Sequence, residues 1–261
     1  MKQTRQAVWL MAILAAALAA GCAERAERDV LFQTATLGAL VEGVYDGNLA
    51  VGELKKHGDL GLGTFDALDG EMVMLDGRVY RIGADGKAEE VADEETTPFA
   101  TVTFFEADHT GSLEGPFDLA HLEEMLDKVL PTKNIPYAVR IEGTFARLKT
   151  RSVPRQTPPY LPLTAAVANQ TVFTYAGANG TIVGFTMPQF FAGLNVPGYH
   201  LHFISDDKKT GGHILDMTVP ADASAELDIT PGFHMILPES GQFAGTDLTK
   251  NMQADLAKVE R

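Results

Sequence analysis

The sequence predicts an α/β protein of the α+β kind, with two halves built on mixed, largely antiparallel β-sheets and few helices. Short segments rich in β-branched and aromatic residues recur along the chain, and glycine-containing turns separate many of them. Only one segment carries a well-formed amphipathic helical pattern. The chain has 261 residues, of which 45% are hydrophobic, so it is long enough for one large globular domain or two smaller ones.

The N-terminal segment is typical of an export signal. Lys2 and Arg5 precede an apolar run over residues 7–20, which is too short to span a bilayer comfortably as a helix. Small residues then stand directly before Cys22, the single cysteine of the chain. This arrangement resembles the lipobox of bacterial lipoproteins, in which the cysteine is lipidated and becomes the mature N-terminus.

Two interpretations of this segment stay open. Leu18 lies four residues before Cys22, where three is usual in a lipobox, so the alternative is a plain secretory signal with an incidental cysteine. We expect residues 1–21 to be a lipoprotein signal peptide and residues 22–30 to be a charged tether. The protein would then be exported and lipid-anchored to the cell envelope, on its periplasmic or extracellular face.

The first globular half is expected over residues 31–152. The Asp76-Gly77 pair predicts a two-residue hairpin turn, and Asp118 is a suitable cap for the amphipathic helix. In chain order the expected elements are a short helix at 37–45, a glycine-rich strand at 57–68, a hairpin of strands at 71–75 and 78–82, a strand at 101–105, a helix at 118–129 and a strand at 137–148.

The second half, residues 164–261, is expected to contain a metal site. Residues 153–163 contain four prolines, so they are interpreted as an irregular connection between the halves. The spacing from Gly58 to Glu71 equals that from His200 to His213, which makes an internal duplication a hypothesis with chance as its equal alternative. The expected elements are a helix at 163–170, a hairpin at 170–185 that turns over residues 177–180, strands at 198–204, 213–219, 225–229 and 233–236, and a terminal helix at 249–259.

The most informative stretch holds three of the seven histidines: His200, His202 and His213. On a strand, His200 and His202 point to the same face, because side chains alternate with a period of two. A polar turn over residues 205–212 returns the chain, so His213 can face the other two. Three converging imidazoles leave a zinc ion with an open position, which is the arrangement of a catalytic zinc site.

The same histidines are compatible with simpler roles and with metals besides zinc. They can be three separate side chains, each satisfied by its own hydrogen bonds, and imidazole sites also suit iron, copper and nickel. With one cysteine, neither an intramolecular disulfide nor a Cys-rich metal site can form. The four remaining histidines lack such spacing and are interpreted as surface or core residues: His57, His109, His121 and His234.

Charged residues elsewhere are candidates for substrate binding. Arg151 and Arg155 stand beside a proline and can present a forked donor to a substrate carboxylate. A surface loop held by salt bridges accounts for them equally well. Glu71, which follows an Asp69-Gly70 turn, is similarly ambiguous by itself.

Over about residues 31–237 the chain resembles the bacterial acetolactate decarboxylases. The resemblance is carried by LFQTATLGALVEGVYDG (31–47), HGDLGLGTFDALDGEMVMLDG (57–77), TPFATVTFF (97–105), YAVRIEG (137–143), KTRSVPRQ (149–156) and GYHLHFISDDKKTGGHIL (198–215). It implies that 2-acetolactate is converted to acetoin and carbon dioxide. The lipobox departs from the family, many of whose members are cytoplasmic.

The resemblance also implies the site residues. It implies a zinc ion held by His200, His202 and His213. It further implies roles at the site for Glu71 and Arg151. A glutamate near the C-terminus closes the family site, and the candidate here is Glu260, with Glu239 as the alternative.

The sequence also limits the partners. A net charge of −14 argues against nucleic acid, because an acidic chain repels phosphates. The expected partners are a small-molecule substrate and, only through the anchor at Cys22, a membrane. A homodimer is a hypothesis that the resemblance suggests.

Two other functions fit parts of the sequence. A cupin-like metal-dependent dioxygenase also uses an H-x-H strand, but normally has a glutamate where this chain has Asp206 or Asp207. A non-catalytic metal-binding lipoprotein fits the export signal but has no use for Arg151.

Overall fold

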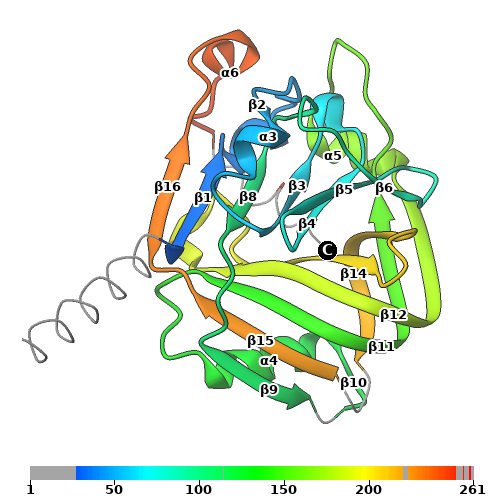
Figure 1. The fold of residues 1–261 in the computed structure, drawn as a ribbon. Coiled ribbons are helices and arrows are strands. Elements are labelled where there is room, and N and C mark those ends of the chain that lie inside the picture. The colour runs from blue at the N-terminus through cyan, green and yellow to red at the C-terminus, as the bar shows by residue number, and fades with distance from the viewer. Residues whose placement is uncertain (1–27, 114, 220–222, 251–254, 256–258, 260–261) are drawn as a thin grey trace, which may run out of the picture.

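In the computed structural model, two seven-stranded β-sheets pack face to face, and α4 (Leu119–Val129) packs against the outer face of one of them (Figure 1). The structure describes residues 28–113, 115–219, 223–250, 255 and 259. The predicted signal peptide, Cys22 and most of the tether lie outside these residues. No helix within the described part of the chain is long and apolar enough to cross a membrane.

The first sheet is antiparallel except at one edge, where β1 pairs with β16 in parallel. The expected hairpin is confirmed, because β4 and β5 pair across Asp76 and Gly77, whose φ angles are 51° and 73°. The strand order is β16 (Gly232–Ile236), β1 (Val30–Thr34), β8 (Ala100–Thr103), β3 (Leu60–Thr64), β4 (Glu71–Leu75), β5 (Arg78–Ile82) and β6 (Ala88–Glu90). A separate pair is formed by β2 (Leu49–Ala50) and β7 (Thr96–Thr97).

The second sheet is organised by β11, which pairs with β12, β15 and β14. Because β14 also pairs with β13, and β13 with β12, these strands and β11 close into a ring. The sheet contains β10 (Phe117–Asp118), β14 (Gly211–Val219), β13 (Gly198–Ser205), β12 (Thr171–Met187), β11 (Tyr137–Ser152), β15 (Ala223–Ile229) and β9 (His109–Leu113).

The hairpin expected at 170–185 is wrong. β12 is one continuous strand that pairs with β11 from Thr171 to Thr186. Because a single 16-residue partner binds both parts of β12, the two parts cannot pair with each other. Gly177, with a φ of 65°, therefore accommodates a local irregularity in the strand and does not reverse the chain.

The sheets exchange strands across the proline-rich connection at 153–163. β11 precedes the connection but lies in the second sheet, whereas β16 follows it and lies in the first. The predicted halves are therefore segments of the sequence, and the boundary between them does not separate the sheets.

Helices are few and short, as the sequence predicts. Among the residues that the structure describes, the longest is α4 (Leu119–Val129), which buries Leu122 and Leu126 on one side. The carboxylate of Asp118 caps it by accepting a hydrogen bond from the backbone N–H of His121. The others are α2 (Leu37–Val41), α3 (Val51–Leu54), α5 (Leu163–Ala166), α6 (Gly241–Gly245) and the 3₁₀ turns η1 (Asp66–Leu68), η2 (Val167–Asn169) and η3 (Gln189–Phe191). The helix expected at 249–259 falls mostly outside the described residues.

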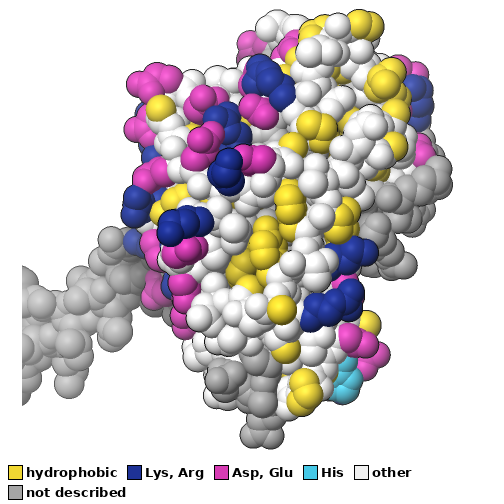
Figure 2. Space-filling model, turned by 90° about the vertical axis from the view of Figure 1, so that its right-hand side faces the viewer, with side chains coloured by type: hydrophobic (Ala, Val, Ile, Leu, Met, Phe, Trp, Pro, Cys, Tyr) yellow, Lys and Arg dark blue, Asp and Glu magenta, His cyan; other side chains and the backbone are white. Residues whose placement is uncertain are grey.

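The core between the sheets is apolar and continuous. Leu62 and Val73 of the first sheet belong to the same buried cluster as Val183 and Ile204 of the second. On the surface shown in Figure 2, Lys and Arg side chains are interspersed with Asp and Glu, and no broad basic patch is present on that face.

Glycines permit close backbone contacts between the strands that carry the candidate site. A Cβ atom on Gly184 would lie 2.1 Å from the carbonyl oxygen of His200 on the neighbouring strand. Such an overlap forces one backbone to move, because neither group is a flexible side chain. Gly184 thus fixes how closely β12 approaches the histidine strand.

We expect Gly184→Ala to lower the melting temperature by about 2–12 °C, since overpacking costs about 1–3 kcal/mol and each kcal/mol lowers the melting temperature by about 2–4 °C in a chain of this size. The matched control is Gly111→Ala on β9, where a Cβ meets no atom within 4 Å. Thermal denaturation followed by circular dichroism measures both variants. Equal melting temperatures for the two variants would show that β12 can move to accommodate the added methyl group.

Candidate metal centre and its pocket

Strand register brings three of the predicted site residues into one row. Arg151 on β11 lies opposite His213 on β14, and His213 lies opposite His202 on β13. Residues directly opposite each other in antiparallel strands share a face of the sheet. His200 is two residues from His202, so it shares this face as well. The prediction that the 205–212 turn returns His213 to the other histidines is confirmed.

The three imidazoles form a compact buried cluster. Their ring centroids are 5.0–5.2 Å apart, and one ring nitrogen from each lies within 4.8 Å of the other two. Nδ1 of His213 is 3.3 Å from Nε2 of His202. Two nitrogens on a tetrahedral zinc ion with bonds of about 2.0–2.1 Å are separated by roughly that distance. The donor set therefore fits a metal such as zinc.

Burial keeps His200 and His202 neutral. It lowers the pKa of His200 to about 3, and the nearby Arg151 guanidinium acts in the same direction. Burial is also the main cause that holds the pKa of His202 well below its usual value, with smaller effects from His200 and Arg151. A metal ligand must offer a lone pair, so neutral imidazoles are prepared for binding at neutral pH.

A backbone group of the first sheet orients one imidazole. Nδ1 of His202 lies 2.7 Å from the carbonyl oxygen of Met72 on β4. A carbonyl can only accept, so Nδ1 carries the proton and donates it, and Nε2 is the nitrogen left for a metal. Metal-binding histidines are commonly fixed in this way by an acceptor behind the ring.

A buried ion pair stands next to the histidines. Nη1 of Arg151 donates to Oε1 of Glu71 at 3.1 Å, and Oε2 of Glu71 lies 3.6 Å from Nε2 of His202. Nη2 of Arg151 donates to the backbone carbonyl of Val259 at 3.0 Å. Both side chains of the pair are more than 90% buried. The structure thus brings Glu71 and Arg151 together with the histidines, as the resemblance implies.

A small pocket of about 30 Å³ opens onto this group of residues. One side of it is polar and contains Thr64, Glu71, Arg151, His200 and His202. The other side is apolar and is formed by Leu37, Leu40, Leu68, Phe99, Val153 and Leu163. Thr64 is not among the residues predicted from the sequence, although a hairpin through the Asp69-Gly70 turn places it opposite Glu71.

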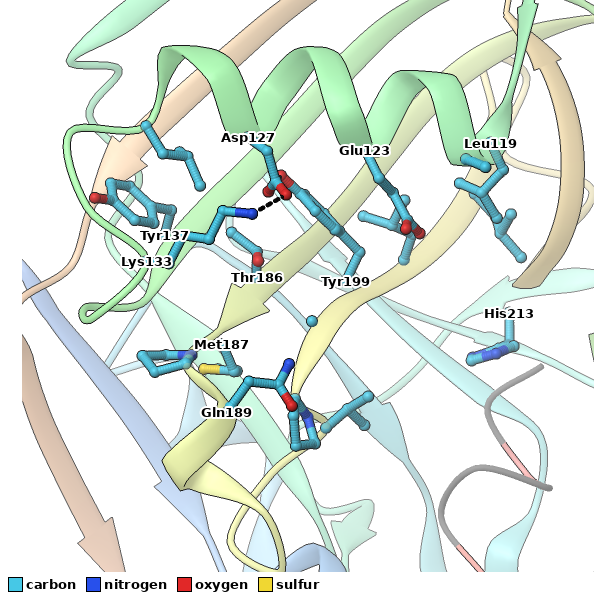
Figure 3. Close-up of a pocket in the computed structure, with 18 of the residues that line it drawn as sticks. Leu119, Glu123, Asp127, Lys133, Tyr137, Thr186, Met187, Gln189, Tyr199 and His213 are labelled. Carbon is cyan, nitrogen blue, oxygen red and sulfur yellow. Dashed lines mark hydrogen bonds and ion pairs between the residues drawn. The ribbon is translucent and has the colours of Figure 1, made fainter. Parts of the chain in front are cut away.

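A larger cleft of about 750 Å³ lies between α4 and β13 and touches the centre only at His213 (Figure 3). Glu123 and Asp127 project into it from α4, and the hydroxyl of Tyr199 donates to Asp127 at 3.0 Å. Burial and these two carboxylates raise the pKa of Tyr199. An acidic lining is unfavourable for an anion, so the small pocket is the better candidate for substrate despite its size.

Other predicted residues lie away from the centre or outside the described part of the chain. Arg155 is half-exposed and pairs with Asp66 at 2.7 Å and Asp69 at 3.3 Å. Glu260 lies outside the described residues, and Glu239 is exposed and does not line the small pocket. Among the residues described, the candidate metal group contains none of the other four histidines.

Comparison with known proteins gives one consistent result. The family model for alpha-acetolactate decarboxylase matches residues 31–250. The alpha-acetolactate decarboxylase of Methanosarcina mazei is 53% identical over 89% of this chain and 81% of its own length, and that of Methylococcus capsulatus is 44% identical over 90% of both. The crystal structure of the Bacillus subtilis enzyme superimposes with a TM-score of 0.85 at 35% identity, over 88% of this chain and 98% of that one.

These matches confirm the resemblance found in the sequence and the α+β fold class. They decide against a cupin-like dioxygenase and against a non-catalytic binding protein. The chain belongs to the alpha-acetolactate decarboxylase family, a family of carboxy-lyases.

Proposed function

We propose that this chain converts 2-acetolactate to acetoin and carbon dioxide at a zinc ion held by His200, His202 and His213. The observation that carries the proposal is the buried guanidinium of Arg151 beside the three histidines. Its Nε–H has no hydrogen-bond partner among the residues that the structure describes. A buried donor without a partner costs about 1–3 kcal/mol, and a substrate carboxylate in the pocket would satisfy it.

The substrate suits the polar side of the pocket. It carries a carboxylate, and a hydroxyl on the carbon between this carboxylate and a ketone. When bound, zinc supplies Lewis-acid stabilisation for the negative charge that develops on the ketone oxygen as carbon dioxide leaves. Arg151 holds the carboxylate in place, and burial excludes the water that would weaken this contact.

Glu71 is positioned to donate a proton to the substrate. In the free site it accepts a hydrogen bond from Arg151. When a substrate carboxylate takes over Arg151, the Glu71 carboxyl carries the proton that the reaction consumes. The Glu71 carboxyl then delivers this proton to the carbon that has lost carbon dioxide, and delivery from one side sets the configuration of acetoin.

A second carboxylate completes the proposed site. Val259, the residue before Glu260, is buried, and its carbonyl accepts from Arg151. This contact places Val259 beside Arg151 and supports Glu260, in preference to Glu239, as the glutamate that closes the site. Glu260 would serve as a further metal ligand or as a second proton donor.

Each of His200→Ala, His202→Ala and His213→Ala is expected to lose bound zinc and activity together, because removing one of three imidazoles leaves too few ligands. Elemental analysis of the purified variants and an acetoin assay test this. The control is His109→Ala, on the exposed strand β9, which should keep both. Full zinc content in one of the three variants would remove that histidine from the ligand set.

Arg151→Lys is expected to lower kcat/KM on the order of 100-fold, because lysine keeps the charge but loses the planar fork. Zinc content and melting temperature should stay near wild type. Arg155→Lys is the matched control and should keep near-normal turnover, since Arg155 pairs with Asp66 and Asp69, neither of which lines the small pocket. If the control loses turnover and Arg151→Lys keeps it, the roles of the two arginines are reversed.

We also propose that the protein is exported and anchored through Cys22, and that it forms a homodimer. The support for the anchor is the signal-like segment and the position of the single cysteine. Cys22→Ser is expected to convert a membrane-associated protein into one that is soluble or unprocessed. Detergent phase separation tests this, and a wild-type protein found wholly in the aqueous phase would contradict the anchor.

A further inference from the structure

The turn before Glu71 has an unusual backbone. Ala67 and Leu68 are consecutive and have φ angles of 61° and 57°, in the left-handed region that residues with a Cβ rarely adopt. Each such residue costs roughly 1–2 kcal/mol. Strain of this kind persists only where the surrounding structure imposes it, and it is common at functional sites.

The surroundings of this turn do impose it. The N–H of Ala67 donates to the carbonyl of Tyr45 at 2.8 Å, and the carbonyl of Ala67 accepts from the N–H of Gln156 at 2.8 Å. Asp66 accepts from Arg155 at 2.7 Å and from the N–H of Gly47 at 3.0 Å. The turn is therefore held on both sides by segments far away in the sequence.

The same contacts fix Leu68 relative to the catalytic groups. Leu68 is 4% exposed and lines the small pocket. Two residues later, the N–H of Gly70 donates to the carbonyl of Val153, and its carbonyl accepts from Thr64 at 2.7 Å. Glu71 follows directly, so the Leu68 side chain and the Glu71 carboxylate are parts of one fixed segment.

The polar and apolar sides of the pocket orient the substrate. The carboxylate and the oxygens belong on the polar side with Arg151 and the histidines, so the alkyl groups must face the apolar side. The free volume is only about 30 Å³, so a substrate bound on the polar side lies against the apolar side chains. Leu40 and Leu163 stand on the one-turn helices α2 and α5, and neither residue has the left-handed backbone of Leu68.

We propose that Leu68 sets the size of the alkyl group accepted on the carbon that bears the substrate carboxylate. The strained turn holds Leu68 in place, and the ion pair of Arg155 with Asp66, which we call the clamp, holds the turn. This inference rests on the proposed function. The Leu68 side chain leaves room for the methyl group of 2-acetolactate and disfavours the homologue with an ethyl group at that carbon. Arg155 acts through the turn and is a positioning residue.

The test compares kcat/KM for 2-acetolactate with kcat/KM for its 2-ethyl homologue. One methylene in an apolar pocket is worth roughly 10–200-fold in discrimination. Leu68→Ala is expected to raise the ethyl-to-methyl ratio about tenfold. The matched control is Leu40→Ala, which removes the same atoms from the same pocket and should change both substrates alike. An unchanged ratio in Leu68→Ala, or an equal rise in Leu40→Ala, would overturn the proposal.

A second variant tests the clamp and does not depend on the folding of Leu68→Ala. Arg155→Gln is expected to raise the ratio about threefold while zinc content and melting temperature stay near wild type. Arg147→Gln, whose side chain is similarly exposed and pairs with Asp216 away from the turn, should leave the ratio unchanged. If Arg155→Gln also leaves the ethyl-to-methyl ratio unchanged, the clamp does not fix the position of Leu68. A wild-type protein that turns over neither substrate would instead refute the proposed function.

Discussion

The buried ion pair between Arg151 and Glu71 is the contact on which the rest of the site depends. Arg151 belongs to the second sheet and Glu71 to the first, so the pair joins the two layers at the centre of the molecule. Removing two charges from water is expensive, and the cost is offset only if further hydrogen bonds satisfy both groups. The carbonyl of Val259 supplies one such partner to Arg151, and in the proposed function a substrate carboxylate supplies another, which ties the pair to function more than to stability.

The same cation shapes the histidine cluster. Burial and, to a smaller extent, the charge of Arg151 disfavour protonation of His200 and His202, so these two imidazoles offer lone pairs near neutral pH. The carbonyl of Met72 then selects which nitrogen of His202 faces the centre. The first sheet therefore contributes no histidine, yet it orients one and supplies the carboxylate beside them.

Many features of the fold could be predicted because they are encoded locally. The alternation of side chains on a strand predicted that His200 and His202 share a face, and the polar turn predicted the return to His213. The Asp76-Gly77 hairpin and the capped helix α4 were predicted for the same reason: each depends on residues close in sequence. Long-range pairing was less predictable, and the hairpin expected in place of β12 was wrong because glycines alone do not show which partner a strand will bind.

The sequence by itself determined the composition of the centre: three histidines at strand spacing, an arginine motif and a glutamate after a turn. Only the tertiary structure decided that Arg151 lies opposite His213, that Arg155 holds the turn at Leu68, and that β16 completes the first sheet. The physical reason is that side-chain periodicity and turn chemistry act over a few residues. Register between distant strands, burial of charge and backbone strain depend on how the whole chain packs.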